Sequence, residues 1–270
     1  MIQRFQKAPR RLSVSLRSST SLPAAIVLAG AGLLVTGCAG ADGAATEETT
    51  VTVLAAASLT QSFTAIGTAF EQANPGVRVV FSFGPSSGLV SQAIEGAPAD
   101  VIATANTATM QTAVDAGVVS TPQAFASNSL TIAVPAANPA NISDLAGLVE
   151  PGVLVAVCEP QVPCGAAAQE VIAASGLPIE PVTFDIDVKA VLTKVILDEV
   201  DAGMVYATDV RAAGNDVIGI SIPADISASV TYPIAGSTST GVPDLTERFL
   251  DFVMSPPAQE ILTQSGFGSP

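Results

Sequence analysis

The chain has 270 residues, and among them there is no histidine, no tryptophan and only ten basic residues. Without histidine, the chain cannot build a Ser-His-Asp or Cys-His catalytic group, a histidine-ligated zinc site or an imidazole proton shuttle. Aromatic residues make up only 4% of the chain, so stacking surfaces for bases or sugars are scarce. The 24 acidic residues give a formal net charge of −14, which argues against nucleic-acid binding, because phosphates are bound by clustered Lys and Arg.

Apolar residues, in contrast, are abundant. They account for 49% of the chain and charged residues for 13%, so the chain can bury a sizeable core and does not have the composition of a disordered protein. Its length suits one large domain or two domains of medium size.

The amino terminus has the pattern of an export signal. Half of the basic residues precede the first acidic residue, Asp42, and an apolar run follows them over residues 22–36. This run is too short, and too interrupted by Pro23 and by glycines, for a spanning helix of about 20 apolar residues. A basic region, an apolar run and small residues are typical of a secretory signal peptide, which we predict over residues 1–37.

The apolar run leads into a segment, residues 34–38 with the sequence Leu-Val-Thr-Gly-Cys, that resembles a bacterial lipobox. In such a signal the cysteine becomes the lipidated first residue of the exported chain. We therefore expect Cys38 to anchor the protein to the outer face of the cell membrane. Two alternatives stay open: an ordinary signal peptide with an incidental Cys38, and a twin-arginine signal at residues 10–11.

The exported chain is strongly acidic. Removal of residues 1–37 takes away five basic residues and no acidic one, so 24 acidic and five basic residues leave a net charge of −19. Residues 38–50 are rich in Gly, Ala, Thr and acidic residues without periodicity, which predicts a flexible tether. We expect the folded part to begin at Val51.

Two cysteines remain beyond Cys38, and they lie six positions apart as Cys158 and Cys164. An exported protein meets an oxidising compartment, so a disulfide between them is expected, with two free thiols as the alternative. A metal site is disfavoured, because no histidine or further cysteine could complete a set of four ligands.

Short apolar runs alternate with segments of helical spacing from residue 51 onward. We expect strands at residues 51–56, 77–83, 99–103, 129–134, 153–157, 182–184, 203–206, 217–220 and 230–234. We expect helices at residues 59–73, 89–94, 165–174, 188–197, 245–254 and 257–264, and one ending near residue 116. The alternation predicts βαβ units with mainly parallel sheets, and thus an α/β protein. The last two helices have no strand between them, so we expect them to pack back on an earlier sheet.

Four junctions between these elements carry small residues and helix starts, at residues 56–58, 84–87, 163–166 and 187–189. In open α/β sheets, ligands bind at the carboxyl ends of strands, where helix amino termini also point. Unpaired N–H groups and the helix dipole make such ends suitable for anions. Each serine alone could equally be a simple helix cap.

Seven segments, all in the same order along the chain, resemble the periplasmic molybdate-binding proteins of ABC transporters, the ModA-like family of solute-binding proteins. Residues 83–89 have the sequence Phe-Gly-Pro-Ser-Ser-Gly-Leu, residues 162–166 Val-Pro-Cys-Gly-Ala and residues 203–209 Gly-Met-Val-Tyr-Ala-Thr-Asp. The other four segments lie at residues 51–60, 96–105, 128–134 and 187–189. Single motifs of this kind are weak, but seven in order are specific, and together they extend over about residues 51–267.

The resemblance implies a two-lobed periplasmic-binding-protein fold of type II, in which each lobe is a mainly parallel sheet flanked by helices and the ligand lies in the cleft between lobes. Lobe 1 would comprise residues 51–127 plus 236–270, and lobe 2 residues 128–235. The two connecting segments would form a hinge that closes on the ligand. Closure would create the surface that a membrane permease recognises.

Proteins of this family bind their oxyanion through two serine hydroxyls, two backbone amides and a tyrosine hydroxyl. Carried over by motif, these groups belong to Ser58, Ser86, Cys164, Val188 and Tyr206. Cys164 stands where the family usually has alanine, which leaves the backbone donor in place. Pro85 replaces a small residue next to Ser86, so Ser87 is the alternative ligand. On its own, a tyrosine in such a strand could equally be a core residue.

A neutral site made only of donors suits a fully deprotonated tetrahedral dianion, because hydrogen bonds to an ionised acceptor are the strong ones. Protonated phosphate is disfavoured, since its P–OH group needs an acceptor. Sulfate is smaller than molybdate, so the size of the cavity would separate those two, whereas tungstate nearly matches molybdate. With a net charge of −19, attraction must come from local dipoles.

The resemblance therefore implies a binding protein, not an enzyme, that captures molybdate and also tungstate without a cofactor and without a direct metal ligand. It would be an extracytoplasmic monomer that delivers the anion to the permease and ATPase of an ABC importer. Alternatives are a receptor for sulfate or ferric ion, a structural lipoprotein, and an exported hydrolase with a Ser-Lys pair. The last would have to use Lys189 or Lys194, and neither lies in a recognised Ser-Lys motif.

Overall fold

The computed structural model describes residues 48–270, which lie in one compact unit. The predicted signal peptide, Cys38 and all of the predicted tether before Glu48 lie outside the described residues. Among residues 48–270, no helix combines the length and the apolar character needed to cross a bilayer.

All the strands and helices expected from the sequence are present, with shifted ends. The strands are β1 (Thr49–Ala56), β2 (Val77–Gly84), β3 (Val101–Ala103), β4 (Gln123–Pro135), β5 (Val155–Cys158), β6 (Thr183–Asp185), β7 (Ala202–Tyr206), β8 (Val217–Ser221) and β9 (Ser229–Gly236). The α-helices are α1 (Thr60–Ala73), α2 (Ser86–Ile94), α3 (Thr107–Asp115), α4 (Pro163–Ser175), α5 (Val188–Ile196), α6 (Ala207–Ala213), α7 (Pro243–Met254) and α8 (Pro256–Gln264). Three short 3-10 helices are η1 (Ala57–Leu59), η2 (Leu145–Val149) and η3 (Gly214–Asp216).

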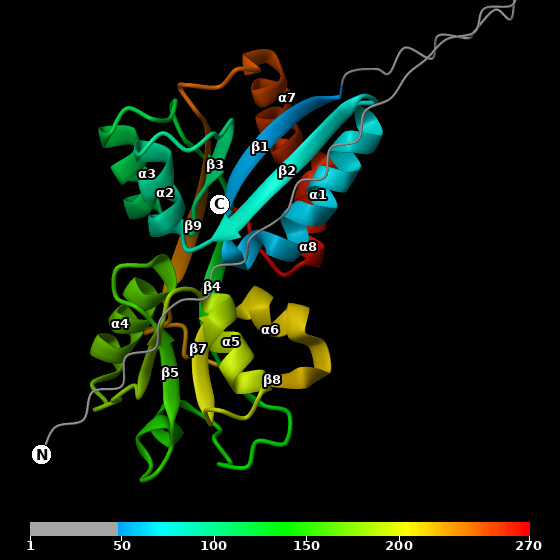
Figure 1. The fold of residues 1–270 in the computed structure, drawn as a ribbon. Coiled ribbons are helices and arrows are strands. Elements are labelled where there is room, and N and C mark those ends of the chain that lie inside the picture. The colour runs from blue at the N-terminus through cyan, green and yellow to red at the C-terminus, as the bar shows by residue number, and fades with distance from the viewer. Residues whose placement is uncertain (1–47) are drawn as a thin grey trace, which may run out of the picture. The chain divides into compact units, whose positions relative to one another are not determined.

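The strands form one mixed sheet in the order β2-β1-β3-β9-β4-β7-β5-β6, with β8 paired to β4. Strand β1 is parallel to β2 and β3, and β5 is parallel to β6 and β7, as the predicted βαβ units require. Strands β4, β8 and β9 are antiparallel to their neighbours. The α/β class is confirmed, but the sheet is more mixed than the prediction of mainly parallel strands, because β4 and β9 run in opposite directions between the two ends of the sheet (Figure 1).

One group of elements surrounds β1, β2 and β3 (Figure 1). Strand β1 is buried on both faces, as expected for a central parallel strand. Helix α1 presents Phe63, Ile66 and Phe70 to this core, and the ring of Phe70 lies 5.1 Å from that of Phe249 in α7. Helix α7 packs on β9 and α1, and α8 packs on α1 and α7, so both lie back on earlier elements, as the missing strand between them predicted.

A second group surrounds β5, β6 and β7, with helices α4, α5 and α6 (Figure 1). The apolar face of α5, which includes Val188, Val191 and Val195, is buried against β7 and β5. Gly203 in β7 permits this close packing, because a Cβ atom there would lie 2.7 Å from the Val191 side chain.

Strand β4 connects the two groups. Its first half pairs with β9 and its second half, from Leu130, pairs with β7 and β8. From the sequence, its start was predicted at residue 129, because polar residues at 127–128 interrupt the apolar run. Two further boundaries differ: β1 begins at Thr49, inside the predicted tether, and α6 follows β7 directly, where no helix was predicted.

Candidate functional site

The five residues assigned by resemblance line one small cavity, between the ends of β1, β2 and β7 and the starts of α4 and α5. They are Ser58, Ser86, Cys164, Val188 and Tyr206. The cavity has a volume of about 20 Å³. This volume exceeds the 10–15 Å³ or so that one water molecule needs and is far below the roughly 300–1,000 Å³ of organic-ligand sites, so it suits a small inorganic ion. Ser87, the alternative to Ser86, lines a different cavity.

Two helix amino termini supply free backbone donors here. Cys164 and Val188 lie in the first turns of α4 and α5, where N–H groups have no partner within the helix. Neither N–H group donates a hydrogen bond to another residue of the described chain. Both helix dipoles direct their positive ends at the cavity, as an anion requires.

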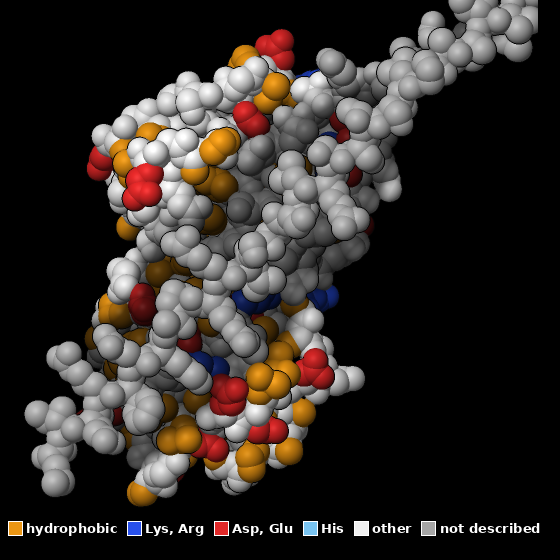
Figure 2. All heavy atoms as spheres, in the orientation of Figure 1, with side chains coloured by type: hydrophobic (Ala, Val, Ile, Leu, Met, Phe, Trp, Pro, Cys, Tyr) orange, Lys and Arg blue, Asp and Glu red, His pale blue; other side chains and the backbone are white. Residues whose placement is uncertain are grey.

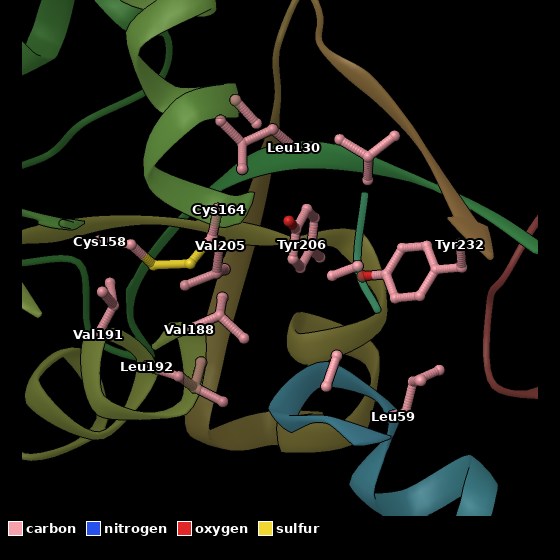
Figure 3. Close-up of a cluster of buried hydrophobic side chains, with 14 of the residues drawn as sticks. Leu59, Leu130, Cys158, Cys164, Val188, Val191, Leu192, Val205, Tyr206 and Tyr232 are labelled. Atoms are coloured by element: carbon pink, nitrogen blue, oxygen red, sulfur yellow. A yellow bond between two sulfur atoms is a disulfide. The ribbon is translucent and has the colours of Figure 1, made fainter. Parts of the chain in front are cut away.

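The hydroxyl of Tyr206 is buried without a partner. The side chain is only 1% exposed, and within residues 48–270 its Oη atom makes no hydrogen bond. Burial is the main reason why the pKa of this phenol lies well above its usual value, so the group stays neutral and keeps its proton. Figure 3 shows Tyr206 in the same region as Cys164 and Val188. The Tyr206 hydroxyl is therefore a neutral donor at the cavity.

The hydroxyl of each serine contacts a neighbouring group of the protein. Ser86 is the first residue of α2, and its Oγ accepts a hydrogen bond from the N–H of Ala105 at 3.1 Å. The Oγ of Ser58 in η1 lies 2.9 Å from the hydroxyl of Tyr232. Because Ser86 accepts from a backbone N–H, its own proton is free to be donated into the cavity.

No basic residue is among the described residues that line the cavity, and one acidic residue is. That residue is Asp187, whose Oδ1 atom caps α5 by accepting from the N–H groups of Lys189 and Ala190 at 2.9 and 3.0 Å. The ammonium group of Lys189 is in turn paired with the buried carboxylate of Asp209 at 2.9 Å. The donors that face the cavity are thus neutral.

A disulfide joins Cys158, at the end of β5, to Cys164, in the first turn of α4 (Figure 3). The predicted bridge is therefore present, and the two Cα atoms lie 5.7 Å apart. Gly165 lets the same turn lie against the preceding backbone, because a Cβ atom there would lie only 1.9 Å from the carbonyl oxygen of Glu159. Both features fix the position of the Cys164 N–H group.

Sequence reasoning missed the residues behind the site. Tyr232 and Asn128 contact Ser58 or each other, and Asp209 binds the N–H of Tyr206 through its carboxylate at 3.2 Å. Asn128 and Asp209 lie in two of the resembling segments, residues 128–134 and 203–209, but had no role assigned, and Tyr232 stood out only as one of two tyrosines. Within residues 48–270, His, Cys, Asp and Glu side chains form no cluster that could hold a metal ion.

Comparison with known proteins identifies the family of the chain. The family model described as bacterial extracellular solute-binding protein matches residues 51–268. The molybdate-binding protein ModA of Mycobacterium tuberculosis is 40% identical over 221 residues, which cover 82% of this chain and 85% of that protein. ModA of Escherichia coli is 33% identical, with 84% and 92% covered.

A solved structure, the periplasmic molybdate-binding protein of Azotobacter vinelandii, superimposes with a TM-score of 0.73 and 20% identity. It covers 82% of this chain and 99% of that chain, and at this identity it shows a shared fold. The matched family consists of solute-binding proteins and not of enzymes. The chain therefore belongs to the bacterial extracellular solute-binding protein family, as a ModA-like member.

Proposed function

We propose that this protein captures molybdate in the cavity formed by Ser58, Ser86, Cys164, Val188 and Tyr206. The observation that carries the proposal is that two serine hydroxyls, two free amides and an unpartnered phenol line one cavity of about 20 Å³. Relatives at 40% and 33% identity carry the name molybdate-binding protein ModA, which supports the same ligand.

The chemistry of the cavity favours a dianion without protons. Each hydrogen bond to a charged acceptor contributes about 1.5–3 kcal/mol, and several such donors converge on the cavity. Hydrogen phosphate carries a P–OH group that needs an acceptor, whereas the five assigned groups act as donors and the Asp187 carboxylate caps α5. Tungstate has nearly the size and charge of molybdate, so we propose that both are bound. Sulfate is the main alternative ligand, and its smaller size disfavours it.

Attraction of the anion depends on local dipoles. Acidic side chains are scattered over the visible face, whereas basic ones are few (Figure 2). Such a surface repels anions at long range, so the amino termini of α4 and α5 must supply the favourable potential close to the cavity. The alternative of a Ser-Lys hydrolase gains no support, because Lys189 and Lys194 are both paired with carboxylates.

We also propose that residues 51–127 plus 236–270 and residues 128–235 act as two lobes that close on the ligand. The cavity takes Ser58 and Ser86 from the first set and Cys164, Val188 and Tyr206 from the second. The Nζ atom of Lys189 lies 3.1 Å from Oε1 of Gln61, a hydrogen bond between the two sets. Closure would form the surface presented to the permease of an ABC importer.

The site of action follows from the export signal. We propose that the protein is an extracytoplasmic monomer held at the cell membrane by lipid on Cys38, and that it passes its anion to a permease with its ATPase. Substitution of Cys38 by serine should release the protein from membranes. A Cys38→Ser protein that stays fully membrane-bound would refute the anchor.

Calorimetric titration tests the ligand. A protein of residues 45–270, which contains the compact unit described over residues 48–270, can be titrated with molybdate, tungstate, sulfate and hydrogen phosphate. We expect one-to-one binding of molybdate and tungstate, with sulfate and phosphate far weaker. If sulfate binds best, the receptor has a different oxyanion, and if no tetrahedral oxyanion binds, the assignment of the site is wrong.

A further inference from the structure

A chain of buried hydrogen bonds lies behind Ser58. Asn128 in β4 contacts the hydroxyl of Tyr232 in β9 through its Nδ2 atom at 3.4 Å, and that hydroxyl contacts the Oγ of Ser58 at 2.9 Å. All three side chains are buried, with exposures of 5%, 0% and 6%. The rings of Tyr232 and Tyr206 lie side by side, with centroids 6.1 Å apart (Figure 3). Tyr232 therefore contacts Ser58, one of the residues predicted to bind the anion, but does not itself line the cavity.

The direction of this chain is fixed at Asn128. Its Oδ1 atom accepts the N–H of Ser129 at 3.0 Å, so its amide nitrogen must face the other way. That nitrogen donates to the Oγ1 of Thr208 at 2.8 Å and to the oxygen of Tyr232. An NH₂ group can only donate, so the hydroxyl of Tyr232 accepts from Asn128 and has its own proton left to donate.

The Oγ atom of Ser58 is within hydrogen-bond distance of the Tyr232 hydroxyl and can accept its proton. Burial raises the pKa of the Tyr232 phenol, so the proton stays on the ring oxygen. When this proton is donated to the Oγ of Ser58, the hydroxyl proton of Ser58 has to point elsewhere, and the cavity is on its open side. Ser86 is held in the same way by the backbone N–H of Ala105. In this arrangement the oxygen of each serine accepts a hydrogen bond from the protein, and its proton is available to the cavity.

We propose that Tyr232 and Asn128 are positioning residues that lock Ser58 as a donor, and that this lock makes the site specific for oxyanions without protons. The inference rests on the proposed function and deepens it. A hydroxyl free to rotate can turn both of its lone pairs toward the P–OH group of hydrogen phosphate, whereas the bond from Tyr232 uses one lone pair and directs the Ser58 proton at the anion, which disfavours acceptance. Rejection of protonated oxyanions is then a property of the hydrogen-bond chain as well as of the size of the cavity.

The test compares two anions of similar size that differ by one proton. Sulfate and hydrogen phosphate are used to displace molybdate from residues 45–270 and from the Tyr232→Phe variant, near neutral pH. We expect Tyr232→Phe to weaken molybdate binding by roughly two- to ten-fold, because Ser58 loses the neutral hydrogen bond that orients its donor. The ratio of sulfate to phosphate affinity should also fall by about ten-fold. A purely structural defect would weaken both anions equally.

Two further variants make the result decisive. Asn128→Ala removes the donor behind Tyr232, so Tyr232 can accept from Ser58, and we expect the same fall in the ratio even if Tyr232→Phe folds poorly. Thr208→Val removes the other partner of Asn128 and should leave the ratio unchanged. Folded Tyr232→Phe and Asn128→Ala proteins that keep the parent ratio would overturn this inference alone. Failure of the parent protein to bind any oxyanion would instead overturn the proposed function.

Discussion

At the scale of single residues, the hydroxyl of Tyr206 is a buried polar group that makes no hydrogen bond within residues 48–270. A buried polar group without a hydrogen bond destabilises the fold by about 1–3 kcal/mol. Its neighbour Tyr232 has partners in Ser58 and Asn128. Two adjacent phenols of the same chemistry therefore differ in what their hydroxyls contribute without ligand.

We predict that Tyr206→Phe weakens molybdate binding at least ten-fold, because one hydrogen bond to a charged acceptor is lost. Without ligand, the same variant should be as stable as the parent or more stable by about 1 kcal/mol, because an unsatisfied hydroxyl is removed. Calorimetry and urea unfolding measure the two effects. Tyr232→Phe is the matched control, since it should lower stability, and equal destabilisation by both variants would contradict the prediction.

The buried carboxylate of Asp209 predicts a dependence of stability on pH. Burial raises the pKa of this carboxyl, although Lys189 at 2.9 Å opposes the rise. A group whose pKa is higher in the folded than in the unfolded state binds more protons when folded. Its contribution is therefore most favourable below the ordinary carboxyl pKa of about 3.9 and is lost as the pH rises through the raised value.

We expect the free energy of unfolding of Asp209→Asn to change less between about pH 4 and pH 7 than that of the parent. Lys189→Met, which removes the opposing cation, should change more. Urea unfolding at both pH values measures the differences. Identical pH dependence in all three proteins would show that Asp209 does not titrate in this range.

At the scale of elements, the first turn of α4 determines where the Cys164 amide points. Gly165 has no room for a side chain, because a Cβ atom would lie 1.9 Å from the Glu159 carbonyl oxygen. We predict that Gly165→Ala lowers the free energy of unfolding by at least about 2 kcal/mol and weakens molybdate binding. Gly241→Ala is the control, because a Cβ there meets nothing within 4 Å. A neutral Gly165→Ala would mean that α4 is free to shift.

The Cys158–Cys164 bridge restrains the same turn. The double variant Cys158→Ala/Cys164→Ala removes a small closed loop from the unfolded chain, so we predict a loss of about 2 kcal/mol in unfolding free energy. Molybdate affinity should fall as well, since the Cys164 N–H loses one of its restraints. Reduction of the parent protein with dithiothreitol should reproduce both changes, and full affinity after reduction would contradict the role of the bridge.

Most strands and helices, but not all of their boundaries, could be predicted from the sequence. Alternating apolar runs were enough to predict each strand of the βαβ units, because a buried parallel strand is apolar throughout. They missed the start of β4 at Gln123, where polar Ser127 and Asn128 lie in a strand that passes between the two groups. Helix α6 was missed because its start, at Tyr206 and Asp209, lacks the usual small cap.

The candidate site was predictable only in part, for the same physical reason. The lining residues follow strand ends, so local motifs located them, and the resemblance assigned their roles. The hydrogen bond between Ser58 and Tyr232 joins positions 174 apart in the chain, and that between Asn128 and Tyr232 joins positions 104 apart. No local pattern reports such contacts, which exist only once β4 and β9 have paired.

At the scale of the whole molecule, the two proposed lobes are in contact through Lys189 and Gln61. We predict that Gln61→Ala weakens molybdate binding by roughly two- to ten-fold, the equivalent of one ordinary hydrogen bond. The Lys189–Asp209 pair remains, so stability without ligand should be unaffected. Gln111→Ala, which removes a hydrogen bond within α3 only, is the matched control. Equal affinities of both variants would argue against a closing contact here.

The disulfide would also make anion binding by the protein depend on whether it has been exported. A newly made precursor in the cytosol keeps its thiols reduced, so the first turn of α4 would lack its tie to β5. The anion-binding amide of Cys164 would then be held less firmly before export than after it. Crossing the membrane would thus complete the receptor, and the unexported precursor would sequester little of the anion inside the cell.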